Sequence, residues 1–369
     1  MPVVLSGTNG VTFPDSSLQV AAASPYVLKN RLINGDMRVD QRNAGASVTI
    51  TTSNQYTVDR WQGGATVSSK FSVQQNAGSV TPPAGFTNYL GCTSLAATSL
   101  GASDYYVVQQ KIEGLNIADL AWGTASAQTV TLSFWVRSSL TGTFGGTIQN
   151  SSGGRSYVFT YTISAANTWE QKSITITGDT SGTWLTTNGI GMYLLFSLGV
   201  GSTFSGTAGS WSGSNLLSAT GATSVVGTNG ATFYITGVQL EVGTSATPFE
   251  RRLYNQELAN CQRYLPALNG IYWTTTGYAY AANTGISFIT FPVTARTAPT
   301  GITFSSLSHF TVANSTNTSY TPTGIVIDVG NPAGTSIIWT TSTGLTSGTP
   351  TRMYASNASA QILFTGCEL

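Results

Sequence analysis

The sequence contains very few charged residues. Of its 369 residues, 15 are Lys or Arg and 14 are Asp or Glu, so 8% are charged and the formal net charge is +1. Soluble domains usually contain about 25% charged residues. A chain with almost no net charge has no basic field to attract nucleic acid or an anionic membrane surface. We therefore expect no nucleic-acid partner.

Histidine and cysteine are also scarce. His309 is the single histidine, which excludes metal sites with several histidines, and no GxSxG motif offers it a nucleophilic serine. The three cysteines, Cys92, Cys261 and Cys367, lie far apart and form no CxxC pair. No GxxxxGK[ST] loop for nucleotide phosphates is present. The sequence predicts a protein that is not an enzyme and that needs no cofactor or metal.

Long apolar runs are missing as well. No run approaches the roughly 20 residues that a membrane-spanning helix needs. The amino terminus, MPVVLSGTNG, lacks the basic start and apolar core of a signal peptide. We expect synthesis in the cytoplasm without a signal peptide, and no insertion into a membrane.

What the sequence has instead is alternation of apolar and polar residues. Val130, Leu132, Phe134 and Val136 alternate with Thr131, Ser133 and Trp135, and similar runs are separated by Gly, Asn, Asp and Ser. This pattern is typical of antiparallel strands with one buried face. It predicts an all-β chain, with a jelly-roll-like sandwich over residues 26–249. Within it, residues 199–230 have the composition of a long surface loop, anchored by Trp211.

The periodicity changes once. Tyr254, Leu258, Cys261 and Leu265 follow spacings of four, three and four, which predicts a linker helix in residues 250–266, stopped by Pro266. Residues 267–369 return to strand patterning and predict a second, smaller β-sandwich. Residues 1–25 are short, polar and rich in turn residues, so they either stay flexible or order on a partner.

Several stretches occur in an ordered set: NGDMRVDQR at 34–42, TLSFWVRS at 131–138, ITGVQLEVG at 235–243 and TPFERR at 247–252. With this set, the chain resembles tail fibre or tail-tip proteins of tailed bacteriophages over about residues 5–300. The resemblance implies a fibre carried on the virion, usually a homotrimer, whose sandwich is similar to carbohydrate-binding modules. It further implies that residues 1–25 attach to tail or baseplate proteins and that the distal end binds a surface glycan or another envelope receptor of the host. A purely structural tail component and a glycan depolymerase are the alternatives.

Two groups of residues are candidate sites. Aromatic rings stack on the apolar face of a sugar, so the distal domain offers glycan contacts, with packing or a subunit seam as the other interpretation of the tyrosines and Trp273. These candidates are Tyr272, Trp273, Tyr278, Tyr280, His309 and Trp339. The second group is Asp40, Arg42, Asp59 and Arg60, which we interpret as a structural ion-pair network because buried charges need partners.

Overall fold

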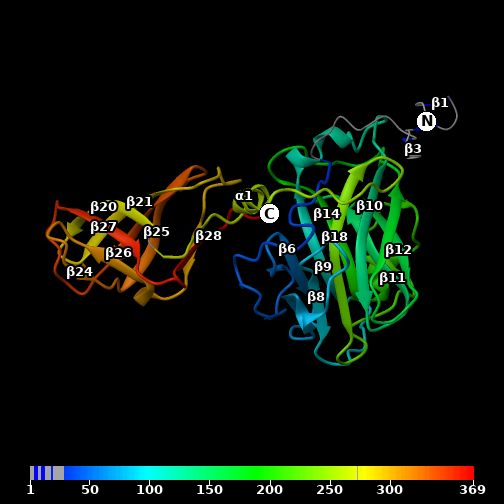
Figure 1. Cartoon of the computed structure of the whole chain (residues 1–369). Coiled ribbons are helices and arrows are strands. Elements are labelled where there is room, and N and C mark those ends of the chain that lie inside the picture. Colours follow the sequence, from blue (N-terminus) through cyan, green and yellow to red (C-terminus); the bar gives the residue numbers. More distant parts are fainter. Residues whose placement is uncertain (1–3, 7–9, 13–17, 20–28, 272) are drawn as a thin grey trace.

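The structure is a computed structural model that describes residues 4–6, 10–12, 18–19, 29–271 and 273–369. Figure 1 shows two β-sandwiches with a short helix between them. We call residues 29–250 the main sandwich and residues 267–369 the distal sandwich. The prediction of an all-β chain with a sandwich, a short helix and a second, smaller sandwich is confirmed.

Three short strands precede the main sandwich. They are β1 (Val4–Ser6), β2 (Gly10–Thr12) and β3 (Leu18–Gln19), and they form a small antiparallel sheet. Most of the predicted attachment segment, residues 1–25, lies outside the described residues. Its attachment role therefore stays a prediction.

The main sandwich consists of two antiparallel sheets. The six-stranded sheet has the order β13 (Glu170–Ile176), β10 (Val130–Ser138), β18 (Thr232–Val242), β8 (Leu90–Ser94), β7 (Phe71–Gln75) and β4 (Val48–Thr49). The seven-stranded sheet has the order β16 (Trp211–Ser212), β12 (Ser156–Ile163), β11 (Gly142–Gln149), β14 (Ile190–Val200), β9 (Tyr105–Glu113), β6 (Trp61–Ala65) and β5 (Gln55–Tyr56).

The core of the main sandwich lies between these sheets. The four apolar residues of β10 identified from the alternation are all buried there. Phe134 packs edge-on against Phe196 of β14, with ring centroids 4.9 Å apart. Leu132 lies between Ile174 and Leu240 on the neighbouring strands. The two-residue period of a strand thus directs one set of side chains into the core.

Residues 199–230 are more structured than a plain loop. They contain the 3-10 turn η4 (Ser202–Phe204), β16, and the parallel pair β15 (Ser205–Gly206) and β17 (Ser218–Ala219). Trp211 anchors the segment as predicted. Its ring packs against Trp122 at 5.3 Å between centroids, and its indole N–H donates to the Thr177 carbonyl at 2.8 Å. Other 3-10 turns are η1 (Ala77–Ser79), η2 (Gly114–Asn116), η3 (Ala118–Leu120) and η5 (Leu307–His309).

The helix is shorter than predicted: α1 spans Tyr254–Gln262. Arg252 lies before the helix and donates to Glu250 at 2.8 Å and to Glu257 at 3.3 Å. Glu257, buried on α1, also accepts the backbone N–H of Asn34. Arg38 donates to the Arg252 carbonyl at 2.8 Å. The first and last of the four sequence motifs therefore meet at α1, where they fix the helix to the main sandwich.

The distal sandwich also has two sheets. A three-stranded sheet has the order β19 (Ala267–Asn269), β28 (Gln361–Thr365) and β22 (Gly301–Phe304). The other, which we call the distal sheet, has seven strands in the order β24 (Ser319–Tyr320), β23 (Phe310–Ala313), β27 (Pro350–Ala355), β20 (Thr274–Ala281), β21 (Thr284–Thr290), β26 (Gly334–Thr340) and β25 (Gly324–Asn331).

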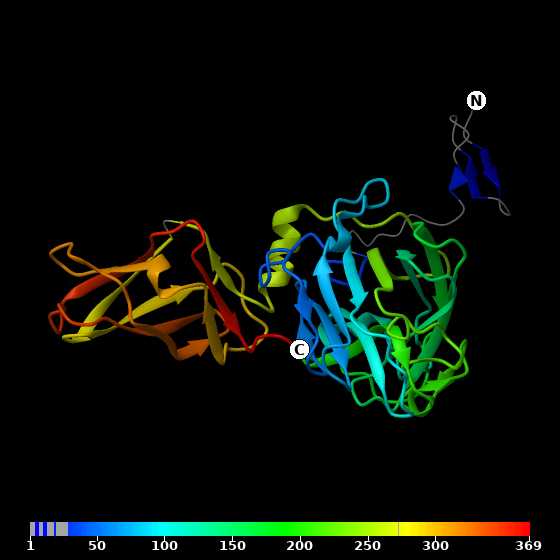
Figure 2. The ribbon, with the colours of Figure 1, turned by 90° about the horizontal axis from the view of Figure 1, so that it is seen from below.

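Residues 366–369 return to the main sandwich after β28 (Figure 2). Glu368 pairs with Arg42 at 2.7 Å, and the Leu369 carbonyl accepts from Tyr56 at 2.9 Å and from Lys111 at 3.0 Å. These contacts join the two sandwiches independently of α1. Within the described residues, no helix is long and apolar enough to cross a membrane.

Candidate functional site

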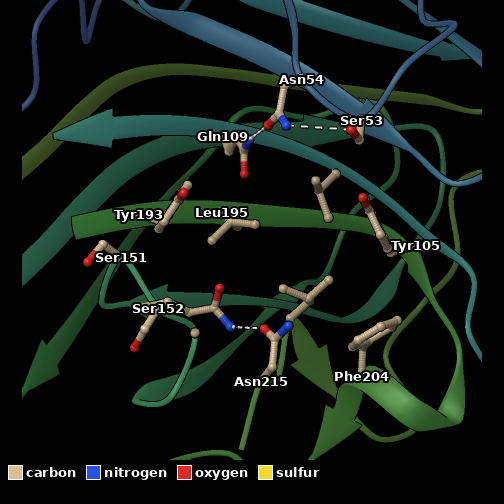
Figure 3. Close-up of a pocket in the computed structure, with 14 residues that line it drawn as sticks. Ser53, Asn54, Tyr105, Gln109, Ser151, Ser152, Tyr193, Leu195, Phe204 and Asn215 are labelled. Atoms are coloured by element: carbon tan, nitrogen blue, oxygen red, sulfur yellow. Dashed lines mark hydrogen bonds between the residues drawn. The ribbon is translucent and has the colours of Figure 1, made fainter. Parts of the chain in front are cut away.

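The outer face of the seven-stranded sheet of the main sandwich carries a pocket with a volume of about 260 Å³. Its lining comes from β9, β11 and β14 and from the loops that contain Asn54, Ser152 and Asn215. Figure 3 shows Tyr193 toward one end of this pocket, Tyr105 and Phe204 toward the other, and Leu195 between them. We call it the sheet pocket.

An apolar cluster forms the floor of the sheet pocket. Val107, Leu195 and Leu217 are buried there, and the rings of Tyr105 and Phe204 pack edge-on at 5.9 Å between centroids. This cluster is separate from the sandwich core on the other side of the sheet. The position opposite Tyr193 on β9 is Lys111, six positions along the strand from Tyr105, a distance of roughly 20 Å. The floor therefore has the length for an extended ligand with several apolar faces.

Amide side chains form the polar part of the sheet pocket. Gln109 donates to Asn54 at 3.1 Å and to Gln62 at 3.0 Å, and Figure 3 shows its carbonyl oxygen turned toward Leu195. Gln149 donates to Asn215 at 2.9 Å and to the Leu216 carbonyl at 2.8 Å. Because both amide nitrogens are already engaged inside the protein, these side chains are held in place and their oxygens are fixed acceptors.

No residue that lines the sheet pocket is charged at neutral pH. Burial raises the pKa of the Tyr193 phenol, which therefore stays neutral. Lys111 lies beside the pocket: its ammonium is 5.9 Å from the centroid of the Tyr193 ring and donates to Leu369. Aromatic rings, neutral amides and hydroxyls suit a neutral ligand with many hydroxyl groups. The lining includes no carboxylate, imidazole or thiol.

The aromatic residues predicted as contacts in the distal sandwich have different surroundings. Trp339 is 0% exposed, and its indole N–H donates to Ser287 at 3.0 Å. The prediction for Trp339 is wrong, because the alternation of β26 turns this ring into the core. Trp273 is half-buried and packs against Phe310 at 5.7 Å between ring centroids. Tyr272 lies outside the described residues.

The other three predicted contacts are accessible and lie on two different elements, β20 and η5. Tyr278 and Tyr280 are exposed on the outer face of β20. His309 is half-buried at the end of η5, with its Nδ1 2.9 Å from the Ser305 hydroxyl. A glycan role for these three residues stays a prediction.

The predicted ion-pair network is wrong in its pairing. Asp40 accepts the backbone N–H groups of Asn43 and Gly45, at 3.1 and 2.7 Å, and so closes a turn. Arg42 pairs with Glu368, at the other end of the chain. The four residues form no ion pair with one another. The sequence pattern correctly indicated that these polar groups need partners, but it could not show that the partners are backbone groups and the carboxy-terminal residues.

Asp59 and Arg60 complete this buried region. Asp59 accepts from the backbone and the side-chain amide of Gln41, at 3.0 and 2.7 Å, yet burial raises the pKa of its carboxyl group to about 7. Arg60 donates to the Lys111 carbonyl at 2.5 Å, and its guanidinium stacks on Tyr264 with 3.6 Å from carbon to ring centroid. Through Arg60 and Tyr264, this region is a second contact between the main sandwich and the α1 segment.

The sheet pocket itself was not among the sequence predictions. One signal for it was visible: the strand from Ile190 to Leu198 has apolar residues on both faces, because Tyr193 and Leu195 occupy the side away from the core. An antiparallel sheet usually exposes polar residues on its outer face. Apolar and aromatic residues on that face therefore mark a covered or ligand-binding surface.

Comparisons with known proteins give no family assignment. No family model matches the chain, and no curated protein matches it. Among solved structures, a putative sugar binding protein from Bacteroides thetaiotaomicron is 12% identical, with a TM-score of 0.34 over 58% of this chain and 100% of that one. A family 4 carbohydrate-binding module is 13% identical, with a TM-score of 0.29 over 57% of this chain and 98% of that one.

A third solved structure is a domain of tailspike protein 4 from bacteriophage CBA120. It is 11% identical, with a TM-score of 0.32, and the match covers 59% of this chain and 22% of the tailspike chain. At identities and TM-scores this low, none of these likenesses identifies a ligand or a partner.

Proposed function

We propose that this chain binds a neutral glycan, non-covalently, in the sheet pocket of the main sandwich. The observation that carries the proposal is the combination of an apolar and aromatic floor with fixed, uncharged amide acceptors on the outer face of a sheet. The rings of Tyr105, Tyr193 and Phe204 offer flat apolar faces to a pyranose. Such rings also tolerate contact with the water around a bound sugar. A neutral polyhydroxylated ligand needs no charged partner.

The resemblance of the sequence motifs to tail fibre proteins gives this binding a biological setting. We propose that the chain is a virion tail fibre protein that mediates adsorption of a bacteriophage to a glycan on the host surface. In this proposal it works as a homotrimer and attaches to tail or baseplate proteins through residues 1–25. A single shallow pocket binds weakly, and several copies on one particle raise the avidity through effective concentration.

The test is a binding measurement on the recombinant chain. We expect the wild type to bind a subset of neutral bacterial surface glycans on an array. Tyr193→Ala and Phe204→Ala should each weaken that binding about tenfold or more, because each removes one stacking face. Tyr278→Ala is the matched control, an exposed tyrosine on the distal sheet that does not line the sheet pocket, and should leave the affinity unchanged when each protein is measured in a monovalent format. Equal losses in all three variants, or a loss confined to Tyr278→Ala, would move the site away from the sheet pocket.

A second experiment separates adsorption from the alternatives. Added chain should compete with phage for host cells, and Tyr193→Ala should compete less well than the wild type. A purely structural tail component would not compete at all. A depolymerase would release reducing ends from host polysaccharide, and we expect none.

A further inference from the structure

The outer face of the distal sheet exposes large apolar side chains. The inner face packs against the three-stranded sheet around Ile337, Trp339 and Met353. On the outer face, the exposed fractions are 61% for Phe288 and 54% for Val326. Figure 1 shows β20, β21, β26 and β25 in the distal sandwich, away from α1. Tyr278 and Pro350 on this face are also exposed, and Ile286 and Ile338 are half-buried.

The apolar side chains form a continuous row across five strands. Pro350 lies opposite Tyr278, Tyr278 opposite Ile286, Ile286 opposite Ile338, and Ile338 opposite Val326. Side chains at paired positions lie on the same face of a sheet, about 5 Å apart. A contiguous apolar row of this kind on a soluble protein marks an interaction surface.

The charges of the distal sandwich are arranged around this row. Residues 267–369 contain four charged side chains, Arg296, Asp328, Arg352 and Glu368. Arg296 donates to the Cys367 and Glu368 carbonyls, and Glu368 pairs with Arg42. The other two, Asp328 and Arg352, are exposed, and neither has an ion-pair partner among the residues described.

Both exposed charges lie on the outer face, on opposite sides of it. Arg352 lies on the outer face because side chains alternate along β27 and its neighbours Thr351 and Met353 are buried. Asp328 is on β25, at the edge of the sheet, and accepts from Ser336 at 2.9 Å. Four strand spacings separate β27 from β25, which is roughly 19 Å. The face is therefore positive on one side, negative on the other and apolar between.

A surface with this pattern is complementary to itself. Rotation about an axis parallel to the strands exchanges the two sides, so that Arg352 of one copy meets the partner's Asp328 while the apolar rows are buried together. The same pairing of Arg352 with Asp328 forms in two arrangements. Around a two-fold axis, two faces are stacked on each other. Around a three-fold axis, one side of each face meets the opposite side of the next face. Closed symmetry of this kind is the rule in homo-oligomers. The scarcity of other charges on this face also fits the depletion of charge in interface cores.

We infer that the outer face of the distal sheet is a self-association surface, and that its occupant is a second copy of this chain. Arg352 pairs with the partner's Asp328, and Tyr278, Ile286 and Phe288 are buried in the contact. This inference rests on the proposed function in one respect: it supplies a contact surface for the proposed homotrimer. It is independent of the sheet pocket, which lies on the other sandwich.

Charge reversal tests the pairing. The wild type should have a multiple of the 38.5 kDa chain mass by multi-angle light scattering. Asp328→Arg and Arg352→Asp should each weaken self-association about 100-fold or more, because like charges then face each other. The double variant Asp328→Arg/Arg352→Asp should restore it. Lys70→Glu, a charge reversal on the main sandwich, is the control and should leave the mass unchanged.

Mixing the two single variants distinguishes the symmetries. In a two-fold dimer, one chain of each variant forms two favourable pairs, so the mixture should assemble fully. In a three-fold trimer, one of the three contacts always keeps a like-charge pair, so the mixture should assemble only partly. Phe288→Thr should also weaken assembly, whereas Val67→Thr, at an exposed valine of the main sandwich, should not.

Three results would overturn the inference. They are a monomeric wild type, an oligomer whose mass is changed by neither single charge reversal, and a double variant that is folded but stays monomeric. Glycan binding is measured on the same samples in a monovalent format. A monomeric wild type that still binds glycan would overturn the self-association surface alone. An intact oligomer that binds no glycan would overturn the proposed function alone. If Tyr278→Ala abolishes glycan binding without changing the mass, the face binds glycan and the inference is wrong.

Discussion

Asp59 should make the stability of this protein fall as the pH rises from mildly acidic to neutral. Its carboxyl group is almost completely buried, and burial raises its pKa from 3.8 to about 7 despite two hydrogen bonds from Gln41. Asp40 and Glu368 lie close enough to raise it further. The folded state therefore holds a proton that the unfolded chain has already lost.

The sign of the effect follows from proton linkage. Below about pH 4 both states are protonated and the contribution of Asp59 is fully present. As the pH rises to about 7, the unfolded state binds fewer protons than the folded state, so the free energy of unfolding decreases. A pKa difference of about 3 units corresponds to roughly 4 kcal/mol. Burial raises the pKa of Asp36, Asp40 and Glu368 as well, which adds to the effect in the same direction.

The assay is urea unfolding followed by tryptophan fluorescence at several pH values between 5 and 8. The wild type should lose stability steadily across this range, with a slope approaching about 1.4 kcal/mol per pH unit from Asp59 alone. Asp59→Asn, which cannot ionise, should show a much shallower slope and be more stable than the wild type at pH 8. Equal slopes for the two proteins would show that Asp59 does not cause the pH dependence of stability.

Three further predictions concern packing, the contact between the sandwiches and ligand binding. Trp211→Ala should lower the free energy of unfolding by about 2 kcal/mol, because the half-buried ring and its hydrogen bond to Thr177 are lost; thermal unfolding measures this. Glu113→Gln should cost about 3 kcal/mol, because Arg263, which donates to both carboxylate oxygens at 2.6 and 3.0 Å, loses its ionic partner; chemical denaturation checks it. Glycan affinity should change less than about twofold over the range of salt that screens surface charges, since no lining residue is charged; a steep salt dependence in calorimetry would contradict this.

The sequence was sufficient to predict the strands and the fold class, because alternation reports directly on a half-buried sheet. The four buried residues of β10 illustrate this. It was less reliable for α1. The residues from Glu250 to Leu253 match the helical pattern, but Glu250 and Arg252 form an ion pair outside the helix, which begins only at Tyr254. Their contacts with distant segments outweigh the local helical preference.

The site could not be predicted because its parts are distant in sequence. The sheet pocket combines residues from segments as far apart as Asn54 and Leu217, and only the strand order of the sheet brings them together. The aromatic cluster of the distal sandwich was conspicuous because it is local. Closeness in sequence does not determine which face of a sheet a ring lies on. Trp339 lies on the inner face of β26, whereas Tyr278 and Tyr280 lie on the outer face of β20.

The most direct test is a crystal structure of the chain with a bound oligosaccharide from a glycan selected on the array. We expect sugar rings on the apolar floor between Tyr193 and Phe204, with hydroxyl groups donating to the Gln109 and Gln149 side-chain oxygens. An oligosaccharide bound elsewhere, with the sheet pocket empty, would show that the sheet pocket is not the glycan site.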